Sequence, residues 1–299
     1  MVSNTFLIFD FNLTSTSEFK FLRFTGFAIQ NFLFKLLGFI DKELAIKLHN
    51  SIRVKPYSVT PLLNNYRTVY HSGKGNTSYN FRIVFFDEEC FDIFHRFYKL
   101  ISEKLYLDNI VFLVNNIHIK VETYDNLLKY MVNDYFTLDF ITPTCFKTGI
   151  VYPKRVKGYG EESIYEVRRK EESAYCPLPI PELMLRNLLR IWKSFSSKPL
   201  PSKNIEDIIS EDHIFVYDFP KGIRTMWARE GSRKNQQGFI GKVTFGTRKL
   251  NNEAKNSIAA LIKLGEYSGT GIMRTAGLGY YKIIEGINKK KVSSTSETS

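Results

Sequence analysis

The order of the predicted secondary-structure elements constrains the fold of this chain more than any other feature. In the first half, apolar residues recur at helical spacing over 25–37, with Thr25 as the expected N-cap and Gly38 as the expected stop. The predicted elements are a strand over 6–13, helices over 25–37 and 41–50, an extended segment over 56–63, a strand over 79–86, a helix over 87–104 and a strand or bent hairpin over 110–123. This order, β-α-β-β-α-β, is typical of a ferredoxin-like domain.

The second half of the chain repeats this order. Its predicted elements are a strand over 135–142, a helix over 182–195, strands over 214–219 and 239–245, a helix over 251–264 and a last strand over 280–284. We expect the basic stretch over 147–169 to be irregular. The sequence therefore predicts an α+β fold of tandem ferredoxin-like (RRM-like) domains with a C-terminal glycine-rich loop. The predicted division is an N-terminal domain over 1–127, a C-terminal domain over 128–288 and a disordered tail over 289–299.

A glycine-rich stretch lies between the last predicted helix and the last predicted strand. Five glycines fall within residues 265–279, with Arg274 and Thr275 between them. Because glycine adopts positive φ and has no Cβ, such a loop lets backbone N–H groups approach an anion. The stretch therefore predicts a loop that holds a phosphate chain against its backbone. The alternative is a glycine-rich turn that only joins two elements.

The position of this loop excludes two kinds of nucleotide site. A dinucleotide-binding glycine loop follows a strand and opens a helix, whereas this loop follows a helix and precedes a strand. A P-loop ends in Gly-Lys-Ser/Thr at the start of a helix, and that sequence is absent here. We therefore expect no nucleotide cofactor.

The net charge indicates the kind of binding partner, and the cysteine content limits the metal and disulfide sites that the chain could form. The formal net charge of +12 favours a polyanionic partner, most often nucleic acid, with an anionic membrane surface as the alternative. Cys90, Cys145 and Cys176 form no Cys-x-x-Cys pair, so we expect neither a zinc site nor a disulfide framework. The sequence shows no signal peptide and no apolar run long enough to span a membrane. These features predict a cytoplasmic protein without a bound metal.

Four further blocks, taken together with the glycine-rich stretch, resemble a known family. The stretch carries Gly-x-Gly at 269–271 and again at 277–279, and the other blocks lie at 55–62, 140–146, 179–181 and 238–245. From about residue 6 to residue 284, the chain resembles the Cas-six endoribonucleases of the RAMP superfamily of CRISPR-associated proteins. Those enzymes cut CRISPR repeat transcripts into guide RNAs.

The resemblance implies metal-independent cleavage of CRISPR repeat RNA within precursor transcripts. In that reaction the 2′-OH attacks the adjacent phosphate and leaves a 2′,3′-cyclic phosphate and a 5′-OH. The chemistry requires a base, an acid and cationic stabilisation of the phosphorane. The implied partner is the repeat RNA, lying along the groove between the two halves. A CRISPR effector complex and a second copy of the chain, as a homodimer, are the other partners considered.

The resemblance places the proton transfers after the first helical region. A histidine there is often followed by a lysine, and His49 and Lys55 match this spacing. His49 would transfer the proton, since histidine titrates near neutral pH, and Lys55 would stabilise charge on the phosphate. The alternative is that His49 only ends the helix over 41–50, where a cation suits the helix dipole.

The tyrosine that some family members use as a second acid/base group is missing from this chain. Phe34 occupies the best matching position and cannot transfer a proton, while the neighbouring Lys35 points about 100° away on a helix. Some family members instead hold the RNA in an in-line geometry with lysines and arginines. The candidates for that mode are Lys35, Lys55, Arg233 and Arg274, with solvated surface charge as the alternative.

The resemblance also implies two RNA-binding segments. One is a basic loop between the strands over 214–219 and 239–245, and the other is the glycine-rich loop. The residues predicted to bind RNA are Arg229, Arg233, Lys234, Gly269, Gly271, Arg274, Thr275, Gly277 and Gly279.

Two other functions stay open at the level of sequence. A non-catalytic RAMP subunit that binds guide RNA in an effector complex would share the fold and the glycine loop without needing His49. A general RNA-binding protein with tandem RRM-like halves is the other alternative. The lack of an RNP-type aromatic motif counts against the latter.

Overall fold

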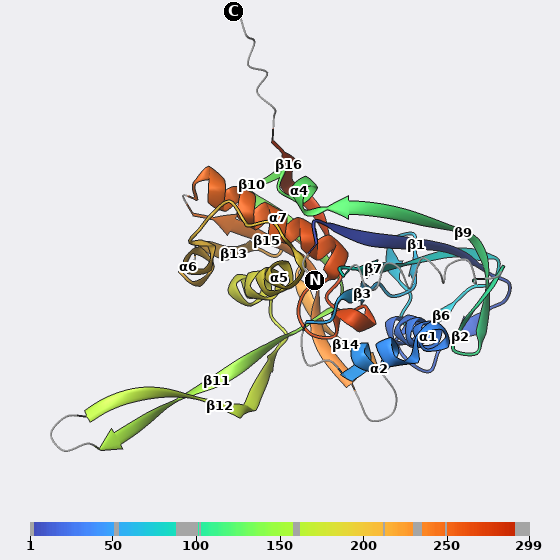
Figure 1. Cartoon of the computed structure of the whole chain (residues 1–299), viewed down its shortest axis with the longest axis horizontal. Coiled ribbons are helices and arrows are strands. Elements are labelled where there is room, and N and C mark those ends of the chain that lie inside the picture. The colour runs from blue at the N-terminus through green and yellow to red at the C-terminus, as the bar shows by residue number, and fades with distance from the viewer. Residues whose placement is uncertain are drawn as a thin grey trace, which may run out of the picture.

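Two antiparallel sheets, each with helices packed against it, form the body of the protein (Figure 1). The computed structural model describes residues 3–50, 54–87, 101, 103–157, 162–211, 213–229, 235–248 and 250–290. Among these residues, no helix is long and apolar enough to cross a lipid bilayer.

The N-terminal sheet is built around β1 (Thr5–Ser15). This strand pairs antiparallel with β7 (Thr77–Phe85) on one side and with β9 (Ile110–Thr123) on the other. The full order is β5-β4-β7-β1-β9-β8, and β3 pairs with β7. The short strands are β3 (Tyr57–Val59), β4 (Leu63–Asn64), β5 (Arg67–Thr68) and β8 (Lys104–Leu107), and β2 (Phe19–Lys20) and β6 (Ser72–Gly73) form a separate ribbon.

Helices α1 (Thr25–Ile40) and α2 (Lys42–Asn50) belong to this half. Phe32 of α1 meets Phe11 of β1 and Phe81 of β7 edge-on, with ring centroids 6.3 Å apart in both pairs. All three side chains are buried. The apolar residues whose spacing predicts a helix over 25–37 therefore form the face of α1 that packs on the sheet.

The predicted ends of α1 are wrong. Thr25 is the first helical residue rather than the N-cap, because its Oγ1 donates to the Val69 carbonyl and accepts from the Leu62 N–H. Gly38 does not stop the helix, which runs on to Ile40. A glycine inside a helix costs only about 1 kcal/mol relative to alanine, and packing on the sheet outweighs that cost.

The C-terminal sheet is built around β10 (Tyr130–Thr144). Its order is β13-β15-β10-β16, and β14 pairs with β15. The strands are β13 (Ile214–Asp218), β14 (Ile223–Arg229), β15 (Asn235–Thr247) and β16 (Tyr281–Lys289), and the helices are α4 (Tyr124–Leu127), α5 (Pro181–Phe195), α6 (Ile205–Ser210) and α7 (Asn252–Ser268). Asn251 caps α7 by accepting a hydrogen bond from the Ala254 N–H.

The predicted tandem ferredoxin-like fold is confirmed, because both sheets follow the same connection order. In each half the first strand lies between the third and the fourth, and the second strand lies beyond the third. The two halves also share apolar contacts, as Phe86 of the first half stacks on Phe195 of α5 with centroids 5.8 Å apart. The division between residues 127 and 128 stays a prediction.

The basic stretch over 147–169 forms a hairpin and is not irregular. β11 (Phe146–Lys157) pairs antiparallel with β12 (Glu162–Cys176), and the hairpin projects away from both sheets (Figure 1). Because this stretch is rich in lysine and arginine, its sequence does not show the alternation of apolar and polar residues that predicts a strand. Backbone pairing between neighbouring segments needs no buried apolar face, so the usual periodicity is weak.

Two other predictions differ from the structure or fall outside it. The helix predicted over 87–104 does not reach its predicted end, since β8 begins at Lys104, and residues 88–100 lie outside the described residues. The short helix α6 and the strand β14 are not predicted. Of the tail predicted over 289–299, residue 289 ends β16, and residues 291–299 lie outside the described part of the chain.

Candidate functional site

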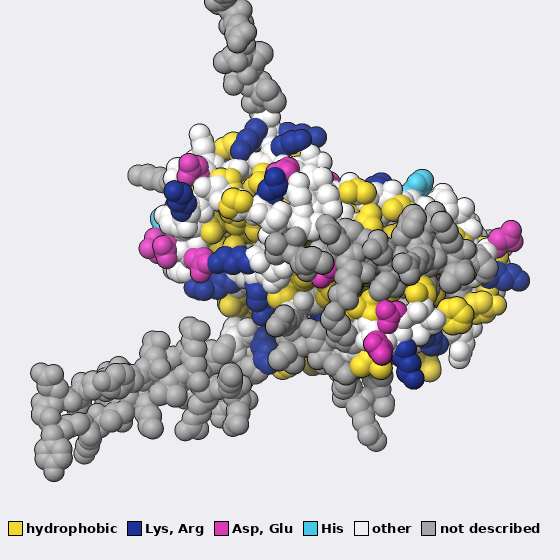
Figure 2. All heavy atoms as spheres, in the orientation of Figure 1, with side chains coloured by type: hydrophobic (Ala, Val, Ile, Leu, Met, Phe, Trp, Pro, Cys, Tyr) yellow, Lys and Arg dark blue, Asp and Glu magenta, His cyan; other side chains and the backbone are white. Residues whose placement is uncertain are grey.

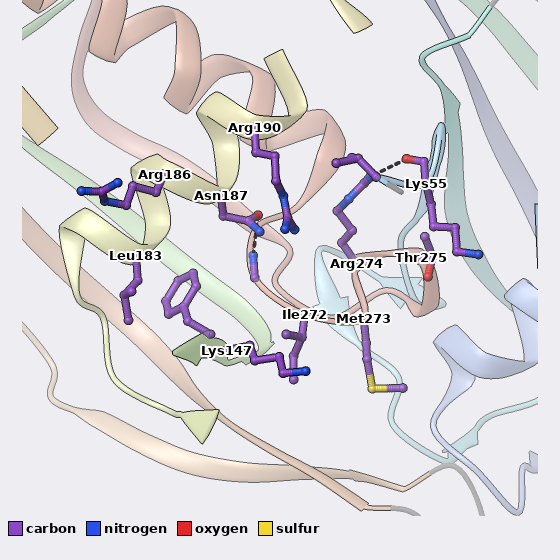
Figure 3. A pocket seen from close by; sticks show the side chains of 13 residues that line it. Lys55, Lys147, Leu183, Arg186, Asn187, Arg190, Ile272, Met273, Arg274 and Thr275 are labelled. Atoms are coloured by element: carbon purple, nitrogen blue, oxygen red, sulfur yellow. Dashed lines mark hydrogen bonds between the residues drawn. The ribbon is translucent and has the colours of Figure 1, made fainter. Parts of the chain in front are cut away.

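A cavity of about 480 Å³ lies where α5, the glycine-rich loop and the segment before β3 meet (Figure 3). Among the described residues that line it, five are basic and none is Asp or Glu; the basic ones are Lys55, Lys147, Arg186, Arg190 and Arg274. Dark blue side chains gather between α5 and the root of the β11–β12 hairpin (Figure 2). A cavity walled by one sign of charge concentrates an anion such as a phosphodiester.

Two of these cations keep their charge available to a ligand. The Arg186 Nε lies 2.7 Å from the Glu182 Oε1, so its charge is partly neutralised on the surface of α5. Arg190 and Lys147 form no ion pair with any residue in the described ranges. The structure therefore brings an unpaired arginine and an unpaired lysine to one cavity.

The glycine-rich loop follows α7, which runs four residues beyond its predicted end at Leu264. The loop then makes a short 3₁₀ turn, η1 (Arg274–Ala276), before β16. Gly269, Gly271, Gly277 and Gly279 all have φ between +65° and +83°. A Cβ on Gly279 would lie 1.7 Å from the Thr270 carbonyl oxygen, so this position requires glycine for both conformation and close approach.

The backbone N–H groups of the four loop glycines at positive φ all donate to acceptors inside the protein. The N–H groups of Thr270, Ile272 and Gly279 donate to the carbonyls of Gly279, Cys145 and Pro143, respectively. The N–H of Gly271 donates to the Asn187 Oδ1 at 2.9 Å. The cradle of free N–H groups predicted from glycine content does not fit this geometry, since the glycines serve close packing.

Arg274 is the buried link between the loop and the N-terminal half. Its side chain is 7% exposed, and its guanidinium donates to the Tyr57 carbonyl at 3.0 Å and to the Lys55 carbonyl. The same group lies 5.8 Å from the centroid of the Phe86 ring. Burial lowers the pKa of Arg274 to about 10, so the guanidinium still carries its charge at neutral pH. The Arg274 guanidinium, which was predicted to bind RNA, thus donates hydrogen bonds to protein carbonyls. Its charge still adds positive potential to the cavity wall.

Lys55 connects the cavity to His49. The Lys55 Nζ donates to the carbonyls of Leu48 and His49, the latter at 2.7 Å, and so satisfies the end of α2. Burial lowers the pKa of Lys55. The exposed His49 ring lies edge-on to Phe34 at 5.5 Å, and Phe34 in turn packs on Tyr57. His49 does not line the cavity but is tied to its wall through Lys55.

One known protein family matches the segment that contains most of the residues lining the cavity. Residues 138–281, which include α5 and the glycine-rich loop, match the family described as CRISPR-associated endoribonuclease Cas6. Over this segment the chain is similar to the Cas6 family. No curated protein sequence matches the chain. The family resemblance inferred from the sequence is therefore confirmed.

Solved Cas6 structures share the fold. A product complex of a Thermus thermophilus Cas6 is similar over 94% of this chain and 100% of that chain, with a TM-score of 0.70 and 23% identity. A second Cas6 product complex has the same coverage, a TM-score of 0.69 and 20% identity. A structure described as a RAMP protein binding different RNA substrates covers 93% of this chain and 100% of its own, with a TM-score of 0.54 and 13% identity.

Other residues predicted for a Cas6 site lie in different places. Lys35 is exposed on α1 near Asp108, whose pKa it helps to lower together with Arg23, and it does not line the cavity. Arg229 is exposed at the end of β14 and also lies outside the cavity lining. Arg233 and Lys234 fall outside the described residues. Thr275 does line the cavity, and its Oγ1 accepts a hydrogen bond from the Gln30 Nε2 at 3.2 Å.

The sequence prediction missed the contribution of α5 to this candidate site. Arg186 and Arg190 are four residues apart, so they share one face of the helix, and Asn187 lies beside them. This spacing was available in the sequence. The contact of that face with a loop some 85 residues later was not, because it depends on tertiary packing.

A second cavity, of about 520 Å³, is less suited to a polyanion. Its lining includes Glu122 and Glu266 as well as Arg82, Lys120 and Lys282. The first two of these cations are already paired with Asp10, at 2.6 Å and 3.2 Å. The first cavity is therefore the candidate site for the chemistry of a Cas6 protein.

Proposed function

We propose that this protein is a metal-independent endoribonuclease that cleaves CRISPR repeat RNA within precursor transcripts to give guide crRNAs. The observation that carries the proposal is the cavity with five basic and no acidic lining residues, built largely by the segment that matches the Cas6 family. The product complexes of Cas6 proteins with this fold support it.

In the proposed reaction the 2′-oxygen of the RNA bonds to the adjacent phosphorus, and the bond from phosphorus to the 5′-oxygen breaks. One proton leaves the 2′-OH and one is delivered to the departing 5′-oxygen, so no water is consumed. The products are a 2′,3′-cyclic phosphate and a 5′-OH. His49 would transfer a proton, while Lys55 and Arg190 would stabilise the extra negative charge on the phosphorane.

A 2′-deoxy substitution tests this reaction. The protein is incubated in EDTA with end-labelled RNA carrying a CRISPR repeat. We expect cleavage at one site, and no cleavage when the nucleotide 5′ of that site lacks its 2′-OH. Cleavage of the 2′-deoxy RNA would exclude the proposed mechanism. Tight binding of the unmodified repeat without any cleavage would instead identify a non-catalytic RNA-binding RAMP subunit.

Replacing His49 with alanine is expected to slow single-turnover cleavage by roughly 100-fold, the usual effect of losing a general acid or base. RNA affinity should change little, because His49 is exposed and does not line the cavity. The rate is measured with enzyme in excess, and the affinity with uncleavable 2′-deoxy repeat RNA. An unchanged rate would assign the chemistry to the lysine and arginine side chains.

Replacing Arg190 with alanine is expected to weaken RNA binding and to lower the salt dependence of binding. The slope of log affinity against log salt should fall by about 0.7–0.9, the value for one lost phosphate contact. Lys193→Ala is the matched control, since Lys193 lies on the same helix but is paired with Glu206 outside this cavity. Equal effects of the two substitutions would show that only overall charge matters.

A further inference from the structure

The candidate cavity is larger and more varied than a phosphate alone requires. Its volume of about 480 Å³ falls within the range of pockets that hold small organic ligands. Beside its cations it has apolar lining from Ile272, Met273 and Leu183. Cations suffice to bind a phosphodiester. The apolar lining therefore suits a second part of the substrate, one that is planar and partly apolar.

Asn187 carries a hydrogen-bond donor at this cavity. It reaches from α5 toward the glycine-rich loop (Figure 3), where its Oδ1 accepts the Gly271 N–H at 2.9 Å. That bond fixes which end of the amide is oxygen, because a backbone N–H requires an acceptor. The Nδ2 forms no hydrogen bond to any residue of the described ranges, and its two hydrogens are therefore available to a ligand.

Met273 provides an adaptable apolar surface at the same cavity. Its backbone is in the left-handed region, with φ of 56°, although it is not glycine. Two hydrogen bonds hold it there, since its carbonyl accepts the N–H groups of both Ala276 and Leu278. Its side chain is 36% exposed. Strained residues fixed by their surroundings concentrate at functional sites, and a thioether packs well on flat rings.

We propose that this cavity holds one unpaired nucleobase next to the scissile phosphate. The Asn187 Nδ2 donates to an acceptor atom on the edge of the base, and Met273 packs against its face. Arg190 and Lys147 contact the neighbouring phosphate, an arrangement that rests on the proposed nuclease function. Single-stranded RNA is read in this way, through hydrogen bonds to the edges of unstacked bases. The cavity therefore selects the base at the cleavage site as well as binding the backbone.

A comparison of base preference in the wild type and in Asn187 variants tests this inference. The substrate is a pool of the repeat RNA in which the three nucleotides on each side of the cut are randomised. Sequencing of cleaved and of bound molecules gives the preference at each position, and the bound pool is 2′-deoxy at the cut. Asn187→Asp keeps the acceptor for the Gly271 N–H and removes the donor, while Asn187→Ala removes both.

We expect the wild type to prefer one or two bases at a single flanking position by about tenfold, a value typical of one hydrogen bond to an otherwise unpaired group. In both variants the preference at that position should fall to about twofold, with the other positions unchanged and the thermal midpoint of Asn187→Asp near that of the wild type. Undiminished preference in the variants would overturn the inference, as would a wild type without any preference. If the RNA is not cleaved at all, the proposed function fails, while the preference in the bound pool still decides the inference.

Discussion

Replacing Arg274 with methionine is expected to lower the free energy of unfolding by about 2–4 kcal/mol, the usual cost of leaving two buried carbonyls without a donor. The guanidinium is buried and donates to the carbonyls of Tyr57 and Lys55. Methionine fills much of the same space, but it leaves both carbonyls without this donor. Urea unfolding followed by circular dichroism measures the change.

Arg186→Met is the control for this experiment. Arg186 also lines the cavity, but it is exposed, and within the described ranges its side chain contacts only Glu182 and Ser210 on the surface. We expect its replacement to change stability by less than about 1 kcal/mol. If Arg274→Met left stability unchanged and weakened only RNA binding, Arg274 would be an RNA contact as the sequence predicted, and its structural role would be excluded.

Replacing Gly279 with alanine is expected to destabilise the protein by at least about 3 kcal/mol, since overpacking and a strained backbone add. The new Cβ would lie 1.7 Å from the Thr270 carbonyl oxygen, and the residue has φ of +72°. That carbonyl is backbone and cannot rotate away as a side chain would. The loop must shift, and with it the bonds that close one wall of the cavity.

Gly38→Ala provides an opposite result for comparison. Gly38 lies inside α1, and a Cβ there would meet nothing within 4 Å. We expect this substitution to stabilise the protein by about 0.5–1 kcal/mol, because alanine loses less entropy in a helix. Thermal unfolding of both variants measures the difference. Equal midpoints would show that the glycine-rich loop tolerates a side chain and is not built by close packing.

Much of the fold was predictable because it depends on local sequence. The apolar spacing over 25–37 gives α1, and the same kind of pattern locates the helices and strands of the second half. The role of the glycines was not predictable in the same way. Positive φ can be inferred from glycine, but whether the freed N–H groups face solvent or the Cys145 and Pro143 carbonyls depends on packing.

The candidate site shows the same division between local and non-local information. Lys55 was identified through a family motif, and the structure places it at the cavity. Lys35, a candidate adjacent to Phe34, lies outside the cavity lining and close enough to Asp108 to help lower the pKa of that carboxyl. Arg190 and Asn187 were missed because nothing in their own neighbourhood marks them. They become candidate site residues only because α5 packs against the glycine-rich loop.

The Arg274 link has a consequence for how the protein meets its substrate. Parting the two halves at this point would leave a buried guanidinium without its two carbonyl partners. We therefore expect the cavity to exist in full before any RNA arrives, with its arginine and lysine side chains already converging. Binding to such a preorganised site costs little free energy for rearrangement of the protein. The site then selects among RNA molecules by how well they fit the existing cavity. If the protein cleaves RNA as proposed, the same rigidity is expected to slow the departure of the cleaved strand.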